Sequence, residues 1–385
     1  MYELNRRAME LPAHQLVDAL ETAIGRKKET IAQRDEQYGK DRAYIYSYGE
    51  NIYLPGTFGF DMRQYYQDPE LALDIDLRSR LFWLDNSHAD DNYTMRFGTG
   101  SMYFDMTLFG IEIDYTKDGV PNMRPHPLAE TMDLSLLKPF DFETTGEMPQ
   151  LIRQYEALNA LAKERCDGRV EYGFPRFNRG PLDIYIQLRG YENFVADVYD
   201  EPEFVKETMD YIVEQRLAFN KAASEYQGKP FTKTRMTIAD DWVNFPFITP
   251  DMFEEFVLPA YRKIVENEGE VARFHTCGVL EPIARQLVEE FPNMNNLELS
   301  GWNDPVKIDR MIPEDVKFRV NFINTFVLRG TREEHMEKLC HLRDIFGHRR
   351  LELWAQAIVR LHPTIDESIG HMNAFIDLAR ETVRL

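Results

Sequence analysis

The chain has 385 residues, of which 43% are hydrophobic, and 65 acidic against 45 basic residues give a net charge of −20. This acidic balance disfavours nucleic acid and membrane surfaces as partners, because both require a basic face. The three cysteines (Cys166, Cys277 and Cys340) are too few and too far apart to suggest a disulfide framework. With neither an apolar signal core nor an apolar run of about 18 residues, the sequence predicts a cytoplasmic protein without a spanning helix.

In the first part of the chain, the sequence predicts helices and loops that do not alternate regularly with strands. A helix is expected over 16–34, where apolar residues share one side. Residues 44–60, rich in Tyr, Gly and Phe, suggest a loop and a short strand. A second helix is expected from Asp68 to Asp85, with Pro69 in its first turn. Residues 93–115 alternate as in a hairpin, and 121–139 form a proline-bearing connection.

Beyond Met148 the pattern becomes regular. Helices are expected over 148–166, 202–226, 250–266, 281–290, 304–311, 332–346 and 366–383. Extended runs are expected over 169–175, 235–241, 271–278, 296–300, 318–323 and 351–358. Strands that alternate with helices imply a parallel sheet, and the lack of a Gly-rich dinucleotide loop favours a barrel over a doubly wound sheet. We therefore predict an α/β fold, a (β/α)8 TIM barrel over 68–385 with an N-terminal extension over 1–67.

The stretch 271–278, Val-Ala-Arg-Phe-His-Thr-Cys-Gly, predicts a strand that ends in chemistry-bearing residues. Side chains alternate along a strand, so His275 and Cys277 share one face. An imidazole nitrogen and a thiolate sulfur are half of a zinc site. The structural alternative is a hydrogen-bonded histidine beside a small buried thiol.

Other predicted strands also end in polar residues, and in a barrel these ends meet at one rim. Glu298 lies between Leu297 and Leu299, so alternation points its side chain into the barrel. His275, Cys277 and Glu298 are thus the predicted ligands of Zn²⁺, with a fourth position open. The alternative for Glu298 is a carboxylate hydrogen-bonded to a neighbouring strand end.

Asp240 and Asp241 are the candidate catalytic residues, since an enclosed carboxylate can act as a general acid or base. They are adjacent, so only one of them is expected to face the barrel, while the other caps a loop or pairs with a base. Trp242, Asn324 and Gln356 are candidate substrate-binding residues at the same rim. For Trp242, packing between helices is the alternative. Cys340 lies on an apolar helical stretch and is expected to pack in the core.

Several motifs, in order, resemble the uroporphyrinogen decarboxylase superfamily. They are Gly180-Pro-Leu-Asp-Ile-Tyr-Ile-Gln-Leu-Arg-Gly190, Asp200-Glu-Pro-Glu-Phe-Val205, Ile238-Ala-Asp-Asp-Trp242, Phe274-His-Thr-Cys-Gly278 and the segment from Asn324 through Gly330-Thr-Arg-Glu-Glu334. The resemblance covers the chain from about Asp68 to its end and implies a TIM barrel.

Two branches of that superfamily bear on function. Its porphyrinogen decarboxylases use no metal or cofactor. Its corrinoid-linked methyltransferases use zinc held by a His-x-Cys pair and a later Cys. Here the His-x-Cys pair is His275 and Cys277, the later Cys is absent near Gln356, and 44–60 lacks the arginines that hold substrate carboxylates in the decarboxylases. Glu298, Asp240 or Asp241 would have to complete the zinc site.

The resemblance therefore implies a zinc-dependent methyltransferase of the O-demethylase type. It would move a methyl group from a small donor, such as an aromatic methyl ether, to the cobalt of a corrinoid held by a partner protein. A metal-free decarboxylase or lyase is the alternative, and a non-catalytic, ligand-sensing relative is a third. The sequence does not identify the methyl donor or the oligomeric state, and it is compatible with a homodimer.

Overall fold

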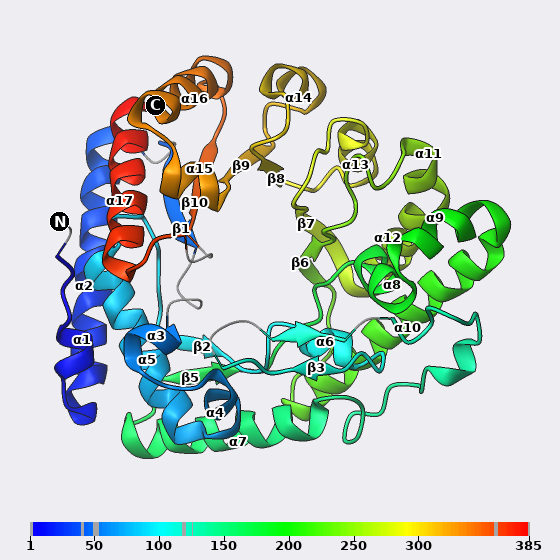
Figure 1. The fold of residues 1–385 in the computed structure, drawn as a ribbon, viewed down its shortest axis with the longest axis horizontal. Coiled ribbons are helices and arrows are strands. Elements are labelled where there is room, and N and C mark those ends of the chain that lie inside the picture. The colour runs from blue at the N-terminus through cyan, green and yellow to red at the C-terminus, as the bar shows by residue number, and fades with distance from the viewer. Residues whose placement is uncertain are drawn as a thin grey trace.

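The computed structural model describes residues 3–39, 42–48, 54–117, 121–124, 126–357 and 361–383. Parallel strands form a ring with helices outside it (Figure 1). This arrangement confirms the predicted (β/α)8 barrel. In chain order its strands are β1 (Tyr44–Tyr48), β2 (Arg96–Gly98), β5 (Glu171–Gly173), β6 (Thr234–Ala239), β7 (Gly269–His275), β8 (Asn296–Ser300), β9 (Lys317–Phe322) and β10 (Leu351–Gln356).

The ring consists of a six-stranded sheet, ordered β1-β10-β9-β8-β7-β6, and the pair β2-β5. All neighbours in these two sheets are parallel. On one side, Arg179 forms a parallel bridge with Ala239 at the end of β6, which joins the segment after β5 to the larger sheet. On the other side, the Asp90 N–H donates to the Ile45 carbonyl at 2.6 Å, which joins β1 to the segment before β2.

Side chains of β9 show how alternation separates the outer core from the barrel interior. Phe318 and Phe322 face the helices, where they meet Phe346 of α16 (Arg332–Phe346) and Phe375 of α17 (Ile365–Thr382), each with 4.9 Å between ring centroids. The intervening Arg319 faces inward. The apolar core therefore lies between strands and helices, and the barrel interior is polar.

The helices after β5 follow the predicted ranges closely. α10 spans Pro202–Tyr226, as expected, and the helical stretch before β7 comprises α11 (Pro250–Met252), η2 (Phe253–Val257) and α12 (Leu258–Glu268). The apolar run over 184–188 lies in a helix, α8 (Pro181–Arg189). The remaining helices here are α9 (Tyr191–Asp200), α13 (Ala284–Glu290), α14 (Pro305–Met311) and α15 (Asn324–Arg329).

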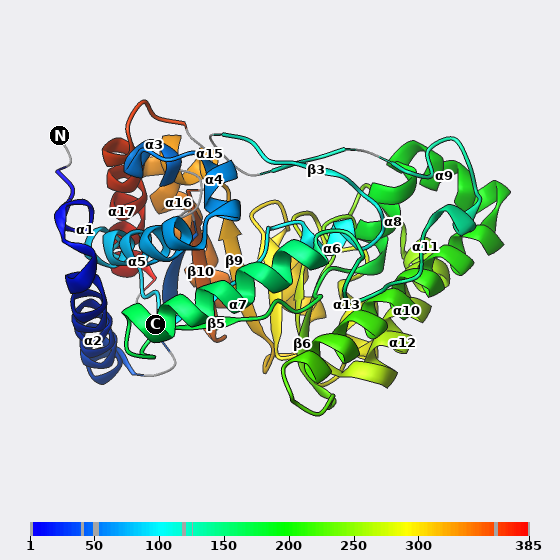
Figure 2. The same ribbon diagram turned by 90° about the horizontal axis from the view of Figure 1, so that it is seen from below.

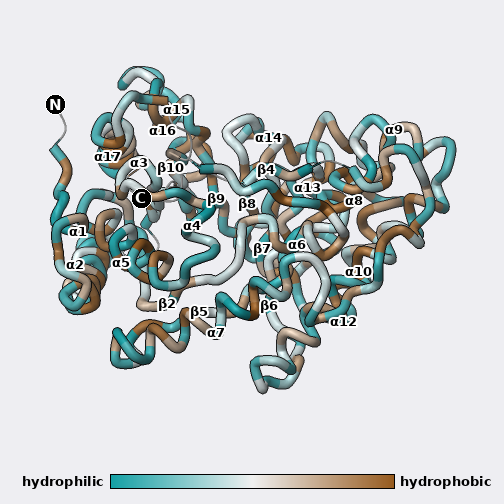
Figure 3. Tube along the Cα trace, turned by 60° about the horizontal axis from the view of Figure 1, so that its bottom comes forward, coloured by the Kyte–Doolittle hydropathy of each residue, from teal (hydrophilic) through white to brown (hydrophobic). Residues whose placement is uncertain are grey.

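Helix α7 (Met148–Arg165) runs across the β2-β5 side of the barrel (Figure 2). Hydrophobic and hydrophilic stretches alternate along it (Figure 3), because one of its faces packs on the core through Leu151, Leu158 and Ala162. Among the helices of the described residues, none has the length and apolar character that crossing a membrane requires.

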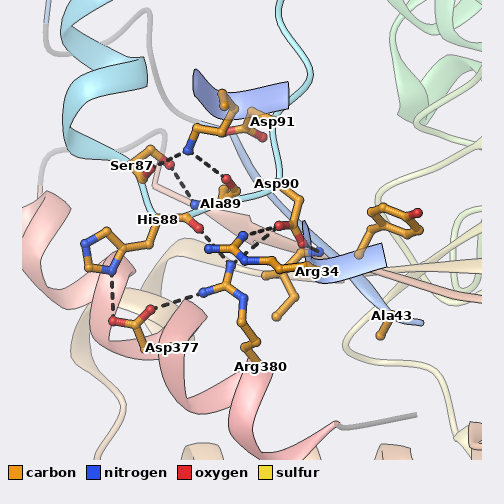
Figure 4. A network of polar contacts seen from close by, with 12 residues as sticks. Arg34, Ala43, Ser87, His88, Ala89, Asp90, Asp91, Asp377 and Arg380 are labelled. Carbon is orange, nitrogen blue, oxygen red and sulfur yellow. Dashed lines mark hydrogen bonds and ion pairs between the residues drawn. The ribbon is translucent and has the colours of Figure 1, made fainter. Parts of the chain in front are cut away.

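The N-terminal part of the chain is joined to the barrel by a buried carboxylate, Asp90 (Figure 4). It pairs with Arg34 of α2 (Ala13–Tyr38), with Arg42 at 2.9 Å and with Arg380 of α17 at 3.7 Å. It also accepts from the Ile45 N–H of β1 at 3.1 Å. β1 belongs to the predicted extension 1–67, so this part of the chain supplies a barrel strand. Its other helices are α1 (Arg7–Glu10), α3 (Leu54–Phe58) and α4 (Met62–Gln67).

The region predicted as a hairpin over 93–115 differs from the expectation. Its first strand, β2, pairs in parallel with β5 as part of the barrel, since Arg96 lies opposite Glu171. A short antiparallel pair does exist, but it joins β3 (Ile113–Asp114) to β4 (Asn122–Met123). Helices α5 (Pro69–Asn86), α6 (Phe104–Thr107) and η1 (Leu134–Leu136) complete this part.

Candidate metal centre

The ends of β6 and β7 bring three different donor atoms together. Asp241, His275 and Cys277 each offer one ligand atom, and these atoms lie within 4.8 Å of one another. His275 Nε2 lies 3.1 Å from Asp241 Oδ1. Cys277 Sγ lies 3.0 Å from the same oxygen and 3.8 Å from Nε2. An oxygen, a nitrogen and a sulfur thus face one point at the carboxyl end of the barrel.

Two loops hold these donors, and Asn244 ties the loops together. Its Nδ2 donates to the Asp241 carbonyl at 2.5 Å and to Thr276 Oγ1 at 3.3 Å. The backbone of Gly278 packs against the same side chain so closely that a Cβ there would overlap with it. Neither Asn244 nor its role was predictable from spacing, because the contact joins segments more than thirty residues apart.

Glu298 lies on the opposite side of the imidazole from the three-atom cluster. Its Oε1 is 2.6 Å from His275 Nδ1, and the side chain is 6% exposed. Asn321 Nδ2 also donates to this oxygen, and Arg319 is 3.7 Å from Oε2. The inward direction predicted for Glu298 is therefore confirmed. The carboxylate that meets Nε2 and Sγ is that of Asp241, whereas Glu298 fixes the orientation of the ring.

Asp240, the other candidate catalytic carboxylate, is fully buried. It accepts from the backbone N–H groups of Leu182 at 3.1 Å and Asp183 at 2.9 Å, in the first turn of α8, and from Tyr261 Oη at 2.9 Å. Burial, together with the nearby charge of Asp183, raises its pKa well above the usual value. A Cβ on Gly180 would overlap with this carboxylate, so glycine is needed there. Of the two adjacent aspartates, Asp240 caps a helix and Asp241 faces the site.

The electrostatics of the three donors favour a cation. Burial by itself lowers the pKa of His275, but hydrogen bonds with Asp241, Cys277 and Glu298 raise it to about 12. Burial tends to raise the pKa of Asp241, but its contacts with His275 lower it overall. Burial raises the pKa of the Cys277 thiol. The carboxylates of Asp241 and Glu298 both lie within 3.1 Å of the imidazole, so the site favours a positive charge.

A buried ion-pair cluster lies behind Asp241. Arg179 pairs with Asp183 at 2.6 Å and with Asp105 at 3.2 Å. Burial and the charge of Asp241 raise the pKa of Asp183 to about 6, against the opposing effect of Arg179. Arg179 and Asp183 lie on either side of the Gly180-Pro181 segment, and their positions in the sequence do not predict that they lie close to the end of β6. Their contact with the site follows from the docking of α8 on Asp240.

The predicted substrate-binding residues lie around the rim but outside the three-donor cluster. Trp242 follows Asp241 directly and stacks on Tyr191, with centroids 5.4 Å apart and planes at 17°. Asn324 begins α15 after β9, and Gln356 ends β10. In the sheet order, two strands separate β6 from β9 and three separate it from β10.

Comparison with known proteins agrees with this architecture. The profile of the family described as Uroporphyrinogen decarboxylase (URO-D) matches residues 57–337. A methylated-thiol–coenzyme M methyltransferase of Methanosarcina mazei is 23% identical over 179 residues, which span 46% of this chain and 45% of that protein. The match thus covers less than half of the curated relative.

A solved structure has the same fold. It is a methyltransferase from Methanosarcina mazei with a TM-score of 0.61 and 18% identity, and the superposition covers 88% of this chain and 94% of that chain. At this identity the likeness establishes the fold alone. The profile match, which extends over most of the chain and includes β6, β7 and β8, shows that this protein belongs to the uroporphyrinogen decarboxylase family.

Proposed function

We propose that this protein is a zinc-dependent methyltransferase that moves a methyl group from a small donor to the cobalt of a corrinoid carried by a separate protein. The observation that carries the proposal is the convergence of Asp241, His275 and Cys277 donor atoms within 4.8 Å. Carboxylate, imidazole and thiolate are ligands that zinc accepts, and three protein ligands leave one position for a substrate. Zinc bound there would act as a Lewis acid on the oxygen or sulfur that carries the methyl group.

The surrounding residues have supporting roles in this proposal. Glu298 holds Nδ1 of His275 at 2.6 Å, which directs Nε2 towards Asp241 and Cys277, where it would serve as a ligand. Asp240 anchors the turn that carries Asp241 by capping α8. Asn244 fixes the β6 loop to the β7 loop. These contacts make the geometry rigid, and a rigid site orients a donor for transfer.

The substrate would lie at the rim beside the centre. Trp242 supplies a partly exposed aromatic surface next to Asp241 and suits an aromatic methyl ether as donor. Asn324, at the start of α15, and Gln356, at the end of β10, would contact the donor. The name of the curated relative, a methylated-thiol methyltransferase, supports methyl transfer as the reaction class. The proposal includes a corrinoid partner as the methyl acceptor, in line with the methyltransferase name of the curated relative.

A metal-free decarboxylase is the second candidate, and one observation favours it. Asp241 and His275 form an ion pair of 3.1 Å. A protonated imidazole beside a carboxylate could stabilise a charged intermediate of decarboxylation. The two candidates differ in their dependence on metal, so a chelator separates them.

The test is metal content and activity after purification without added zinc. We expect about one zinc per chain by elemental analysis, and methyl transfer to added cob(I)alamin that is lost on chelation and restored by zinc. Cys277→Ser should lose zinc and activity. Cys340→Ser changes a partly buried cysteine on α16, away from the cluster, and should keep both. Full activity in metal-free protein would refute the proposal.

A further inference from the structure

Some side chains inside the barrel near the candidate metal centre are partly accessible to solvent. Arg273 of β7, together with Trp354 and Gln356 of β10, is only partly buried. Phe274 and Ala355, which point the other way along the same strands, are fully buried against the helices. Arg273, Trp354 and Gln356 face inward, so this part of the interior is not a closed apolar core.

Arg273 occupies this interior directly beneath His275. The two residues are two apart on β7, so they share one face at a spacing of about 7 Å along the strand. Phe274 between them contacts Tyr261 of α12, with centroids 6.1 Å apart, which confirms that Arg273 and His275 point inward. A ligand seated at His275 that extends into the barrel would meet the Arg273 guanidinium next.

Arg273 is also without a partner. Among residues 3–39, 42–48, 54–117, 121–124, 126–357 and 361–383 it makes no hydrogen bond or ion pair, and its buried Nε has no acceptor. A partly buried guanidinium normally has a carboxylate, because leaving its donors unsatisfied is costly. The charged or phenolic groups that influence it most are Arg319, Glu352, Glu298 and Tyr46.

The two carboxylates near Arg273 already have other partners. Glu352 pairs with Lys317 and with Arg319 at 3.0 Å, and Glu298 holds His275 at 2.6 Å. Lys317 and Arg319 share Glu352, and Glu298 pairs with His275, so both carboxylates are taken and Arg273 has none of its own. An anionic group on a bound ligand would supply the partner that Arg273 lacks.

We propose that Arg273 is the residue that recognises a carboxylate on the methyl donor, so that the substrates of this protein are small anionic methyl compounds and not neutral ones. This inference rests on the proposed function, because it assumes that the donor sits at the three-atom centre. Tyr46 and Trp354, whose rings lie 5.3 Å apart in the same interior, would contact the apolar part of the donor. A guanidinium fits a carboxylate through two parallel hydrogen bonds, which gives preference as well as affinity.

The test is a binding measurement on the protein alone with matched pairs that differ only in charge. The probes are 4-methoxybenzoate against 4-methoxybenzamide, and methoxyacetate against methoxyacetamide, titrated by calorimetry up to about 10 mM. The wild type should bind at least one carboxylate about 10- to 100-fold more tightly than its amide. Arg273→Met should abolish that preference while binding of the amide stays unchanged, and Arg273→Lys should restore part of it. Arg235→Met, an exposed arginine on neighbouring β6, is the control and should behave as the wild type.

Each other outcome overturns the inference. It is wrong if neither carboxylate binds the wild type, if the amides bind as well as the acids, or if folded Arg273→Met keeps the preference. Circular dichroism and the melting temperature establish folding of the variants. The measurement needs no turnover, so it separates the two proposals. A preserved carboxylate preference in a protein that transfers no methyl group would refute the function and not the role of Arg273.

Discussion

Replacing Glu298 with Gln should weaken zinc binding without abolishing it, because Glu298 contacts the far side of the imidazole. Its Oε1 lies 2.6 Å from His275 Nδ1, while the three donor atoms of the cluster lie around Nε2. Loss of a carboxylate that orients a ligating histidine typically weakens a metal site about 10- to 100-fold, or roughly 1.4 to 2.7 kcal/mol. Loss of a direct ligand, as in Asp241→Ala, should have a larger effect and release the metal.

Competition with a chromophoric zinc chelator measures both dissociation constants. Glu270→Gln, which changes an exposed carboxylate on the same strand as His275, is the matched control and should leave zinc affinity unaltered. The order predicted is wild type, then Glu298→Gln, then Asp241→Ala, from tightest to weakest. The reverse order, with metal lost in Glu298→Gln and retained in Asp241→Ala, would refute the assignment of Asp241 as the ligand and of Glu298 as the orienting residue.

Three further predictions concern the scaffold. Asp90→Ala removes the fully buried carboxylate that pairs with Arg42, which keeps only its pair with Asp35, and should lower the free energy of unfolding in urea by about 3 kcal/mol; an unchanged midpoint would contradict this. Burial by itself raises the pKa of Asp90, but the Ile45 N–H and the charges of Arg42 and Arg380 lower it overall. The ionised carboxylate therefore contributes its full stabilising free energy above the pKa that Asp90 has in the unfolded chain, about 4, and this stabilisation should be lost as the pH falls below that value. A pH titration of unfolding should show this acid loss in the wild type and less of it in Asp90→Asn. Gly180→Ala forces a Cβ into the Asp240 carboxylate and should lower the melting temperature, whereas Gly228→Ala, at a position with open space but a φ of 65°, should cost only about 1 kcal/mol.

The sequence predicted the second half of the barrel well because its helices and strands begin and end at residues with strong local preferences. Pro202 begins α10 and Thr331 caps α16 through a capping box, so both helices start where expected. β8 spans Asn296–Ser300, and the two leucines that flank Glu298 determine its inward direction. His275 and Cys277 lie together as predicted, but β7 ends at His275, short of the predicted end at Gly278, so Cys277 lies in the bend after the strand and alternation alone does not place it.

The third donor was not predictable from alternation because the strand ends too early. β6 stops at Ala239, so Asp240 and Asp241 lie in a turn, and their directions depend on the docking of α8 and on Asn244. These contacts join segments far apart in the chain. A short strand was expected within 44–60, and β1 lies there, but its place in the barrel was not predictable because its pairing with β10 depends on residues some three hundred positions away.

X-ray absorption at the zinc edge tests the central claim most directly, since it reports the atoms around the metal in the purified protein. We predict one sulfur at about 2.3 Å and nitrogen or oxygen neighbours at about 2.0 to 2.2 Å, with the sulfur signal lost in Cys277→Ser. Zinc without sulfur in its first shell, or a protein that takes up no zinc, would contradict a centre built from Asp241, His275 and Cys277.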